Sequence, residues 1–185
     1  MYNNYILNKG AKMYNPFLDR EKALETIVYL SQTTQDVFHL MKVIYYAEKL
    51  HLEKYGQSIY GDFFMKMEDG PVPSGAYDIV KCVRDGSCPY DSKIEELKPN
   101  EALQMADHYK ILPKRKPRLE YLSESNIECL NEAVNNYGQM DFNSLWQIVH
   151  QEKPYIESEL NKPISSEKLI KSLPNGNDIY RYLID

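Results

Sequence analysis

The amphipathic pattern between Asp36 and Gly56 is the feature that most constrains how this chain folds. Apolar residues recur there at three- and four-residue steps, which places them on one face of a helix: Val37, Leu40, Met41, Ile44, Ala47 and Leu50. A second apolar seam runs beside the first, through Phe38, Tyr45 and Leu52. A helix with so wide an apolar arc packs on two sides. We therefore expect a central helix over about residues 36–55, ended by a left-handed cap at Gly56.

The residues after this helix predict a small β element. Residues 59–67 are rich in aromatic side chains and indicate a short strand. Gly70–Pro73 predicts a sharp turn, with Pro73 at the first position of the next helix, over residues 73–84. A second short strand is expected within residues 102–112, where it could pair with residues 62–67. Residues 87–100 predict a surface loop.

Capping residues predict the remaining helices. They are expected over residues 21–31, from Ser123 to a stop at Gly138, from Asp141 or Asn143 to near Lys153, from Ser165 or Ser166 to Leu173, and over residues 178–183. The predicted fold class is therefore mainly α: a compact helical domain around the central helix, with a small two- or three-stranded β element.

The length of 185 residues suits one domain. We expect an N-terminal extension over residues 1–20, the domain proper over 21–160, and a C-terminal helical tail of the same domain over 161–185. No apolar run approaches the roughly 20 residues of a membrane span, and the first residues lack a signal-peptide pattern. With three cysteines, an odd number, free reduced thiols are expected. These features predict a cytoplasmic protein without a membrane partner.

The residues that commonly carry chemistry are scattered. His39, His51, His108 and His150 lie far apart, and no zinc-type or phosphate-binding motif is present. We therefore expect no metal, no cofactor and no enzymatic activity. An enzyme built from a Tyr, Asp and His150 constellation remains open, and a perturbed pKa at His150 inside a cleft would favour it.

One basic run stands out, in residues 113–118. Lys114, Arg115, Lys116 and Arg118 could contact an anion or a nucleic acid, or could form a solvated edge that deters strand pairing. The net charge of −5 makes nucleic acid an improbable main partner.

Several ordered blocks of this sequence resemble the Panacea domain, also called the SocA-like antitoxin domain. They are HLMKVIYYAEKLHLEKYG, the Gly61-Asp62 pair, GPVP, YDIVKCVRDGS, YLSESNIECLNEAVNNYG, and the spacing of Phe142, Leu145 and His150. The resemblance as a whole covers roughly residues 24–155. The resemblance implies a mainly helical fold with a small β element, no recognised catalytic residues and no required cofactor. The family pattern usually has Asp where Asn126 stands, which predicts a weaker helix cap here.

The resemblance also implies a function, that of an antitoxin which neutralises a cognate protein toxin by direct binding. Two alternatives stay open: a DNA-binding autoregulator that uses residues 113–118, and a protease adaptor that delivers its partner for degradation, as one relative does. We expect the partner to contact residues around the GPVP segment: Asp62, Glu68, Asp69, Pro71, Pro73 and Tyr77. A homo-oligomer is also open.

Overall fold

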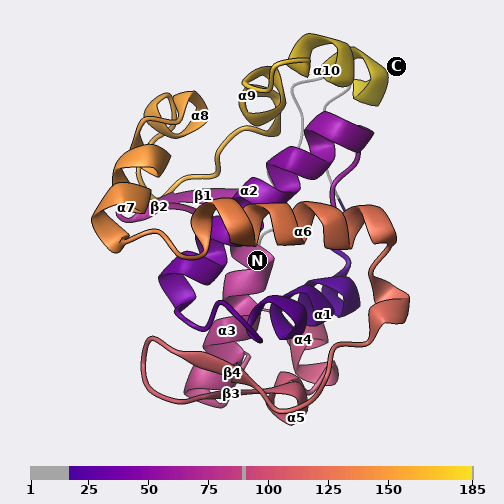
Figure 1. Cartoon of the computed structure of the whole chain (residues 1–185), viewed down its shortest axis with the longest axis vertical. Helices are drawn as coiled ribbons and strands as arrows, with labels where there is room; N and C mark the ends of the chain where they lie inside the picture. Colours follow the sequence, from indigo (N-terminus) through magenta and orange to yellow (C-terminus); the bar gives the residue numbers. More distant parts are fainter. Residues whose placement is uncertain (1–16, 89–90, 185) are drawn as a thin grey trace.

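The computed structural model describes residues 17–88 and 91–184, and helices dominate it (Figure 1). The longer helices are α1 (Arg20–Leu30), α2 (Val37–Tyr55), α3 (Ser74–Asp85), α6 (Glu124–Tyr137), α7 (Phe142–His150) and α10 (Gly176–Ile184). The shorter ones are α4 (Ser92–Glu96), α5 (Pro99–Ala102), α8 (Lys153–Ile156), α9 (Ser166–Lys171) and the 3₁₀ turn Leu119–Tyr121. The strands are β1 (Phe64–Met67), β2 (Gly70–Pro73), β3 (Leu103–Met105) and β4 (Ile111–Pro113). The predicted mainly α class is confirmed.

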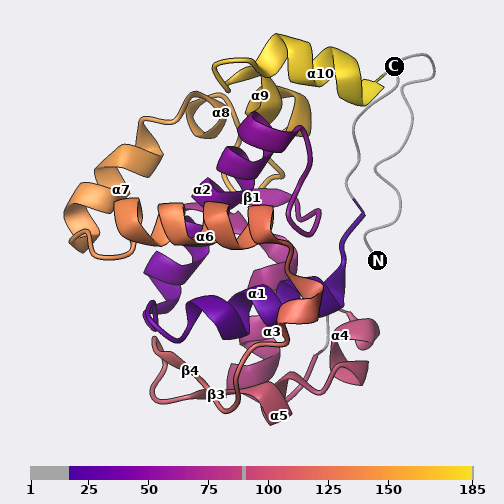
Figure 2. The ribbon, with the colours of Figure 1, turned by 45° about the vertical axis from the view of Figure 1, so that its right-hand side comes forward.

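The central helix α2 forms as its sequence pattern predicts. Asp36 caps its first turn by accepting a hydrogen bond from the His39 N–H, and Gly56 ends it with a φ of +65°. Residues of both predicted seams are buried, among them Leu40, Met41, Ile44, Tyr45 and Leu52. Both ribbon views show α6 lying across one side of α2 (Figures 1 and 2). Neighbouring elements thus pack against the wide apolar arc of α2 on more than one side.

The segment Gly70–Pro73 is a strand, so the predicted turn there is wrong. It pairs antiparallel with β1, with Met67 opposite Gly70 and Phe64 opposite Pro73. The turn itself lies between these strands, at Glu68 and Asp69. Two prolines in four residues look like turn residues in a sequence, yet at the edge of a two-stranded sheet their missing N–H groups cost no ladder hydrogen bond.

The strand predicted from residue 59 begins only at Phe64. The reason is a buried carboxylate. Glu48 of α2 accepts hydrogen bonds from the backbone N–H groups of Ile59 at 2.8 Å and Tyr60 at 3.2 Å. The N–H groups that a strand ladder would use at these two residues are therefore already paired with a side chain.

The predicted pairing of residues 102–112 with residues 62–67 is also wrong. β3 pairs antiparallel with β4, its neighbour along the chain, and the two sheets are separate. The edge of β1 that faces away from β2 is covered by backbone from the C-terminal part of the chain. Lys66 donates to the Lys162 carbonyl at 2.9 Å, and Ile164 donates to the Phe64 carbonyl at 2.7 Å.

Several boundaries differ from the prediction by a few residues. Pro73 is the N-cap of α3 rather than its first residue, and residues 87–100 contain α4 and the first half of α5 instead of a plain loop. Asp91 caps α4 with its side chain, and Pro99 stands at the start of α5. Ser123, Asp141 and Ser165 are the N-caps of α6, α7 and α9, as predicted from the sequence.

The N-terminal cap of α6 explains what the Asn126 side chain does in this fold. Ser123 and Asn126 form a reciprocal capping box, and the Asn126 Nδ2 lies 2.9 Å from the buried His51 Nε2. The other ring nitrogen of His51 lies 2.7 Å from the Gln57 carbonyl, which fixes the proton on Nδ1 and leaves Nε2 as an acceptor. A carboxylate at position 126 has no proton to donate to His51. The Asn126 amide thus caps the helix and satisfies His51 together.

Two of the three cysteines are bonded, which corrects the expectation of free thiols. Cys82, near the end of α3, forms a disulfide with Cys88. Gly86 ends α3 with a φ of +70° and turns the chain back toward Cys82. Cys129 is free and buried. None of the helices in the described ranges is long and apolar enough to cross a membrane.

One hydrophobic core joins elements from both ends of the described chain. Its central layer comes from α1, α2, α3 and α6. The segment after residue 161 adds Leu169, Ile170, Leu173 and Ile179, which pack into the same cluster. In both ribbon views α9 and α10 cover the C-terminal half of α2 (Figures 1 and 2).

Candidate partner-binding surface

The turn between β1 and β2 is held against the body of the molecule by a close approach at Gly70. Its φ is +103°, and a Cβ atom built there would lie 2.7 Å from Val149 Cγ2 and 3.1 Å from Lys42 Cε. Only glycine combines this backbone conformation with this approach. The turn therefore rests on α7 and α2, and Glu68 and Asp69 point their exposed side chains outward from it.

A buried lysine lies beneath this turn. Lys42 of α2 is 1% exposed, and its Nζ donates to the Pro71 carbonyl at 3.0 Å and lies 5.0 Å from the centre of the Phe38 ring. Burial lowers the pKa of Lys42 to about 7, and the charge of Asp69 opposes that shift. Lys42 thus connects the hairpin, the Asp69 carboxylate and the Phe38 ring.

His150, at the end of α7, fixes the turn from its other side. Its Nε2 lies 2.9 Å from the Glu68 carbonyl, and its Nδ1 lies 2.7 Å from the Trp146 carbonyl. Tyr155 of α8 donates its hydroxyl to the Met67 carbonyl at 2.9 Å. Two side chains from different helices therefore hold two successive carbonyls of the turn.

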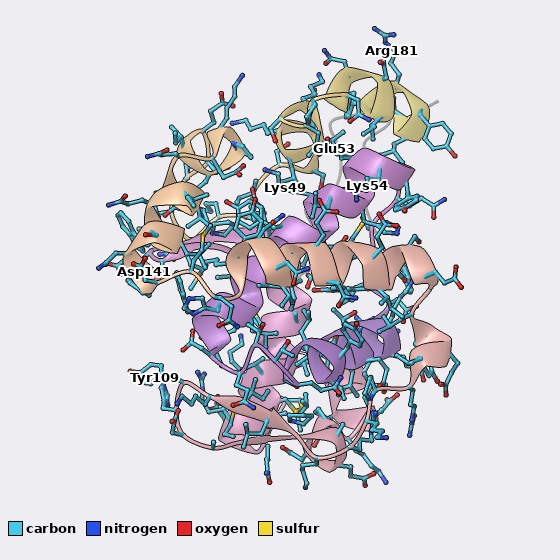
Figure 3. The ribbon with its side chains drawn as sticks, viewed as in Figure 1. Lys49, Glu53, Lys54, Tyr109, Asp141 and Arg181 are labelled. Atoms are coloured by element: carbon cyan, nitrogen blue, oxygen red, sulfur yellow. A yellow bond between two sulfur atoms is a disulfide. The ribbon has the colours of Figure 1, made fainter. Side chains whose placement is uncertain are left out.

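Two large aromatic side chains project from α7 into solvent. Phe142 is 47% exposed and Trp146 is 37% exposed, and at a spacing of four residues they lie on one face of the helix. Trp146 stacks on the His150 ring, with a centroid distance of 3.6 Å, and Phe142 contacts Phe38 at 4.5 Å. Figure 3 shows Asp141, the N-cap of α7, at the outer end of this helix.

These contacts connect α2, the hairpin turn and α7 in one group of residues. We define the α7 patch as the residues in it that reach the surface: Phe38, Glu68, Asp69, Phe142, Trp146 and His150. Lys42 lies beneath them. The patch combines exposed aromatic rings, a rigid acidic turn and adjoining helix caps, which is the composition of a protein-recognition surface rather than of a small-molecule pocket.

A half-buried polar cluster supports the connection from α7 to α8. Lys49 of α2 forms an ion pair with Glu152, and its Nζ lies 5.4 Å from the Tyr45 ring and 5.6 Å from the Tyr46 ring. Burial and the charge of Glu152 raise the pKa of Tyr45 well above its usual value. Lys49 lies on α2 in Figure 3, below the C-terminal helices. The cluster anchors the residues that follow the patch.

Asp62, predicted to contact a partner, is buried in the fold. It is 4% exposed, and its carboxylate accepts hydrogen bonds from the N–H groups of Phe63, Gly75 and Ala76 at 2.8 to 3.0 Å. Burial raises the pKa of Asp62 to about 6, and these N–H groups oppose the shift. Because Pro73 offers no side-chain cap, Asp62 supplies the missing cap of α3 from outside the helix.

The other predicted partner residues do not form one surface. Pro71 and Pro73 are buried, and Tyr77 is half-buried on α3, where its ring lies 5.3 Å from the Lys81 Nζ. Only Glu68 and Asp69 of the six predicted residues belong to the α7 patch. The prediction from the sequence therefore did not separate residues that shape the turn from residues that the turn presents.

The basic residues 114–118 are partly used within the fold. Arg115 forms a two-pronged ion pair with Glu25 of α1, whose side chain is 3% exposed. Lys114 donates to the Asn100 carbonyl at 2.8 Å, while Lys116 and Arg118 have exposed side chains. The Arg118 N–H also donates to Glu25. This segment is thus attached to α1, and three of its four cations are exposed on it.

The described residues show no site for a metal ion. Across residues 17–88 and 91–184, no group of three His, Cys, Asp or Glu side chains could hold one. His150 is occupied by the contacts with the turn described above. A cavity of about 70 Å³ near residues 115–118 has a lining of mixed charge, with Glu21, Lys98, Glu101, Arg115 and Arg118 around it.

Sequence reasoning missed Phe142 and Trp146 as surface residues. Their helix carries apolar side chains at Phe142, Leu145, Trp146, Ile148 and Val149, more than one buried face requires. In the structure only Leu145 and Val149 of these are fully buried. The surplus of apolar residues on a short helix was the signal that could have indicated an exposed apolar face.

The fold and the patch define a class: a mainly helical domain, organised around one central helix, with a short hairpin and an exposed aromatic and acidic face. A family model described as the antitoxin SocA-like, Panacea domain matches residues 40–156, more than half of the chain. The chain therefore belongs to the SocA-like Panacea domain family, which confirms the resemblance seen in the sequence. Comparisons with curated proteins and with solved structures found no match.

Proposed function

We propose that this protein is the antitoxin of a toxin–antitoxin pair and that it neutralises its toxin by direct protein–protein binding in the cytoplasm. The observation that carries the proposal is membership of the SocA-like antitoxin family over residues 40–156. The α7 patch adds a physical reason, since exposed aromatic side chains on a rigid scaffold are typical of surfaces that bind proteins.

The charge of the chain supports the same proposal. The net charge is −5, and toxins that act on RNA or nucleotides present basic clefts to their substrates. An acidic partner would be attracted to such a cleft and would associate with it rapidly. Binding of this kind requires no catalytic residue in the antitoxin.

A growth-rescue assay tests the proposal. The adjacent open reading frame is expressed alone and then together with this protein, and colonies are counted. We expect the neighbour to stop growth and this protein to restore it. If the neighbour is harmless, or if growth stays arrested on co-expression, antitoxin function is contradicted for this pair.

Co-purification then separates direct binding from the two alternatives. A stable complex of the two purified proteins supports masking of the toxin. Rescue that disappears in a host strain lacking an ATP-dependent protease supports delivery for degradation. Binding to the operon's own promoter that weakens on substitution of Lys114, Lys116 and Arg118 supports autoregulation, with a salt slope reduced by about one unit per lost phosphate contact.

A further inference from the structure

We propose that the α7 patch is the surface that contacts the toxin and that it receives a basic segment of that partner, with an arginine or lysine side chain against Trp146 and close to Glu68 and Asp69. This inference rests on the proposed function. It specifies, in addition, which face of this protein contacts the toxin and what kind of toxin side chain binds there.

The first support is the exposure of the aromatic rings. Phe142 and Trp146 lie four residues apart on one face of α7, and both remain exposed, at 47% and 37%, although Phe142 contacts Phe38 of α2. Trp146 is held in place by stacking on His150, so it presents one face of its indole ring in a fixed position. Fixed tryptophan side chains contribute large shares of binding energy because little side-chain entropy is lost when a partner covers them.

The second support is the charge around these rings. Glu68 and Asp69 form the exposed turn next to His150, and the N-caps Asp36 and Asp141 precede the two phenylalanines of the patch in the sequence. The ammonium group among them, that of Lys42, is buried beneath the patch and is turned toward the Pro71 carbonyl. A surface with the two exposed carboxylates of this turn and electron-rich ring faces complements a cation.

The third support is the rigidity of the arrangement. Two carbonyls of the turn are held by His150 and Tyr155, and Gly70 lies tightly against Val149 and Lys42. The carboxylates of Glu68 and Asp69 are therefore carried on a backbone that is held by contacts with α7, α8 and α2. A guanidinium group could stack on the indole of Trp146 while it forms hydrogen bonds with a carboxylate of the turn.

The aromatic part of the inference is tested with Trp146→Ala and Phe142→Ala, and with Tyr182→Ala as a matched control. Tyr182 is an exposed aromatic residue on α10, far from α7 (Figure 1). The probe is the toxic product of the adjacent reading frame, whose Kd is measured by calorimetry. We expect Trp146→Ala to weaken binding by about 30-fold or more, as at other tryptophan hot spots, and Tyr182→Ala to change it less than about 2-fold.

The charge part is tested with a double reversal, Glu68→Lys with Asp69→Lys. The matched control is Glu95→Lys with Glu96→Lys, which reverses two adjacent exposed acids on α4 and changes the net charge equally. We expect the first pair to slow association by about 10-fold at low salt and the control pair to have little effect. Both pairs replace exposed side chains, so this test stays valid even if Trp146→Ala unfolds the protein.

The outcomes separate this inference from the proposed function. If the wild-type protein fails to rescue growth, the proposed function is wrong and the inference falls with it. If the wild-type protein rescues and the patch variants bind as tightly as the controls, only the inference is overturned. If sedimentation shows a wild-type dimer that Trp146→Ala converts to a monomer, the patch binds a second copy of this chain, which also overturns it.

Discussion

Three buried ionisable residues contribute to the way the stability of this protein depends on pH. Burial raises the pKa of Glu48 to about 7 and that of Asp62 to about 6, and it lowers the pKa of Lys42 to about 7. For the two acids, stability is highest when both are protonated and is lost as the pH rises toward 6 or 7. For Lys42, stability is regained as the pH rises from about 7 toward 10.5. These groups therefore oppose folding most near neutral pH.

The substitution Glu48→Gln isolates one of these contributions. The unfolding free energy of the wild-type protein should fall between pH 4.5 and about 7 as Glu48 ionises. We expect most of this fall to be absent in the variant, because a neutral amide does not ionise. One proton contributes a slope of about 1.4 kcal/mol per pH unit. Urea unfolding at a series of pH values measures it. Glu96→Gln, at an exposed position of α4, serves as the control and should leave the profile unchanged; a wild-type-like profile for Glu48→Gln would contradict the assignment.

At the scale of the secondary-structure elements, the start of α3 depends on a side chain that is distant in sequence. Asp62 accepts hydrogen bonds from the N–H groups of Gly75 and Ala76, at the point where the N-cap Pro73 has no side-chain acceptor. The same carboxylate accepts from Phe63, at the entry to β1. One residue thus joins the beginning of the hairpin to the beginning of the helix that follows it.

We expect Asp62→Ala to destabilise the protein by roughly 2–4 kcal/mol, because it leaves buried N–H groups without an acceptor. Amide hydrogen exchange should become faster in the first turn of α3 before it does elsewhere. Asp141→Ala provides the comparison, since it removes an exposed cap from α7 and should cost only about 1 kcal/mol. Equal losses of stability from the two substitutions would show that the burial of Asp62 does not increase its contribution to stability.

The elements differ in how far the sequence predicts them. The helix α2 was predictable because the spacing of its apolar residues and the position of Gly56 indicate the same helix. The hairpin was not, because Pro71 and Pro73 are turn residues by local preference and only tertiary position makes them a strand. The candidate surface was predictable only at Glu68 and Asp69. Burial of Asp62 and exposure of Trp146 depend on which elements pack together, which local patterns do not record.

At the scale of the whole molecule, the C-terminal segment is part of the core. Leu169, Ile170, Leu173 and Ile179 are buried in the same hydrophobic cluster as α2. Each such side chain stabilises the fold by about 1.5–3 kcal/mol on burial. Their sum is comparable to the roughly 5–15 kcal/mol by which a domain is stable. The family match ends at residue 156, so this support lies outside the matched region.

Deletion of residues 165–185 should therefore abolish cooperative folding. Circular dichroism during heating would show a broad transition or none, in place of a single sharp one. Leu169→Ala is the milder variant, for which we expect a loss of about 2–5 kcal/mol with cooperative unfolding retained. A truncated chain that melts sharply near the wild-type temperature would show that residues 1–164 fold without the C-terminal segment.

The hairpin also limits the ways in which another chain can bind to it. The backbone of residues 161–164 already occupies the free edge of β1. On the other side, Pro71 and Pro73 have no N–H to donate, and the Pro71 carbonyl is taken by Lys42. Neither edge offers the row of donors and acceptors that β-augmentation requires. The sheet cannot act as a template for intermolecular strand exchange, so recognition of this hairpin depends on its side chains.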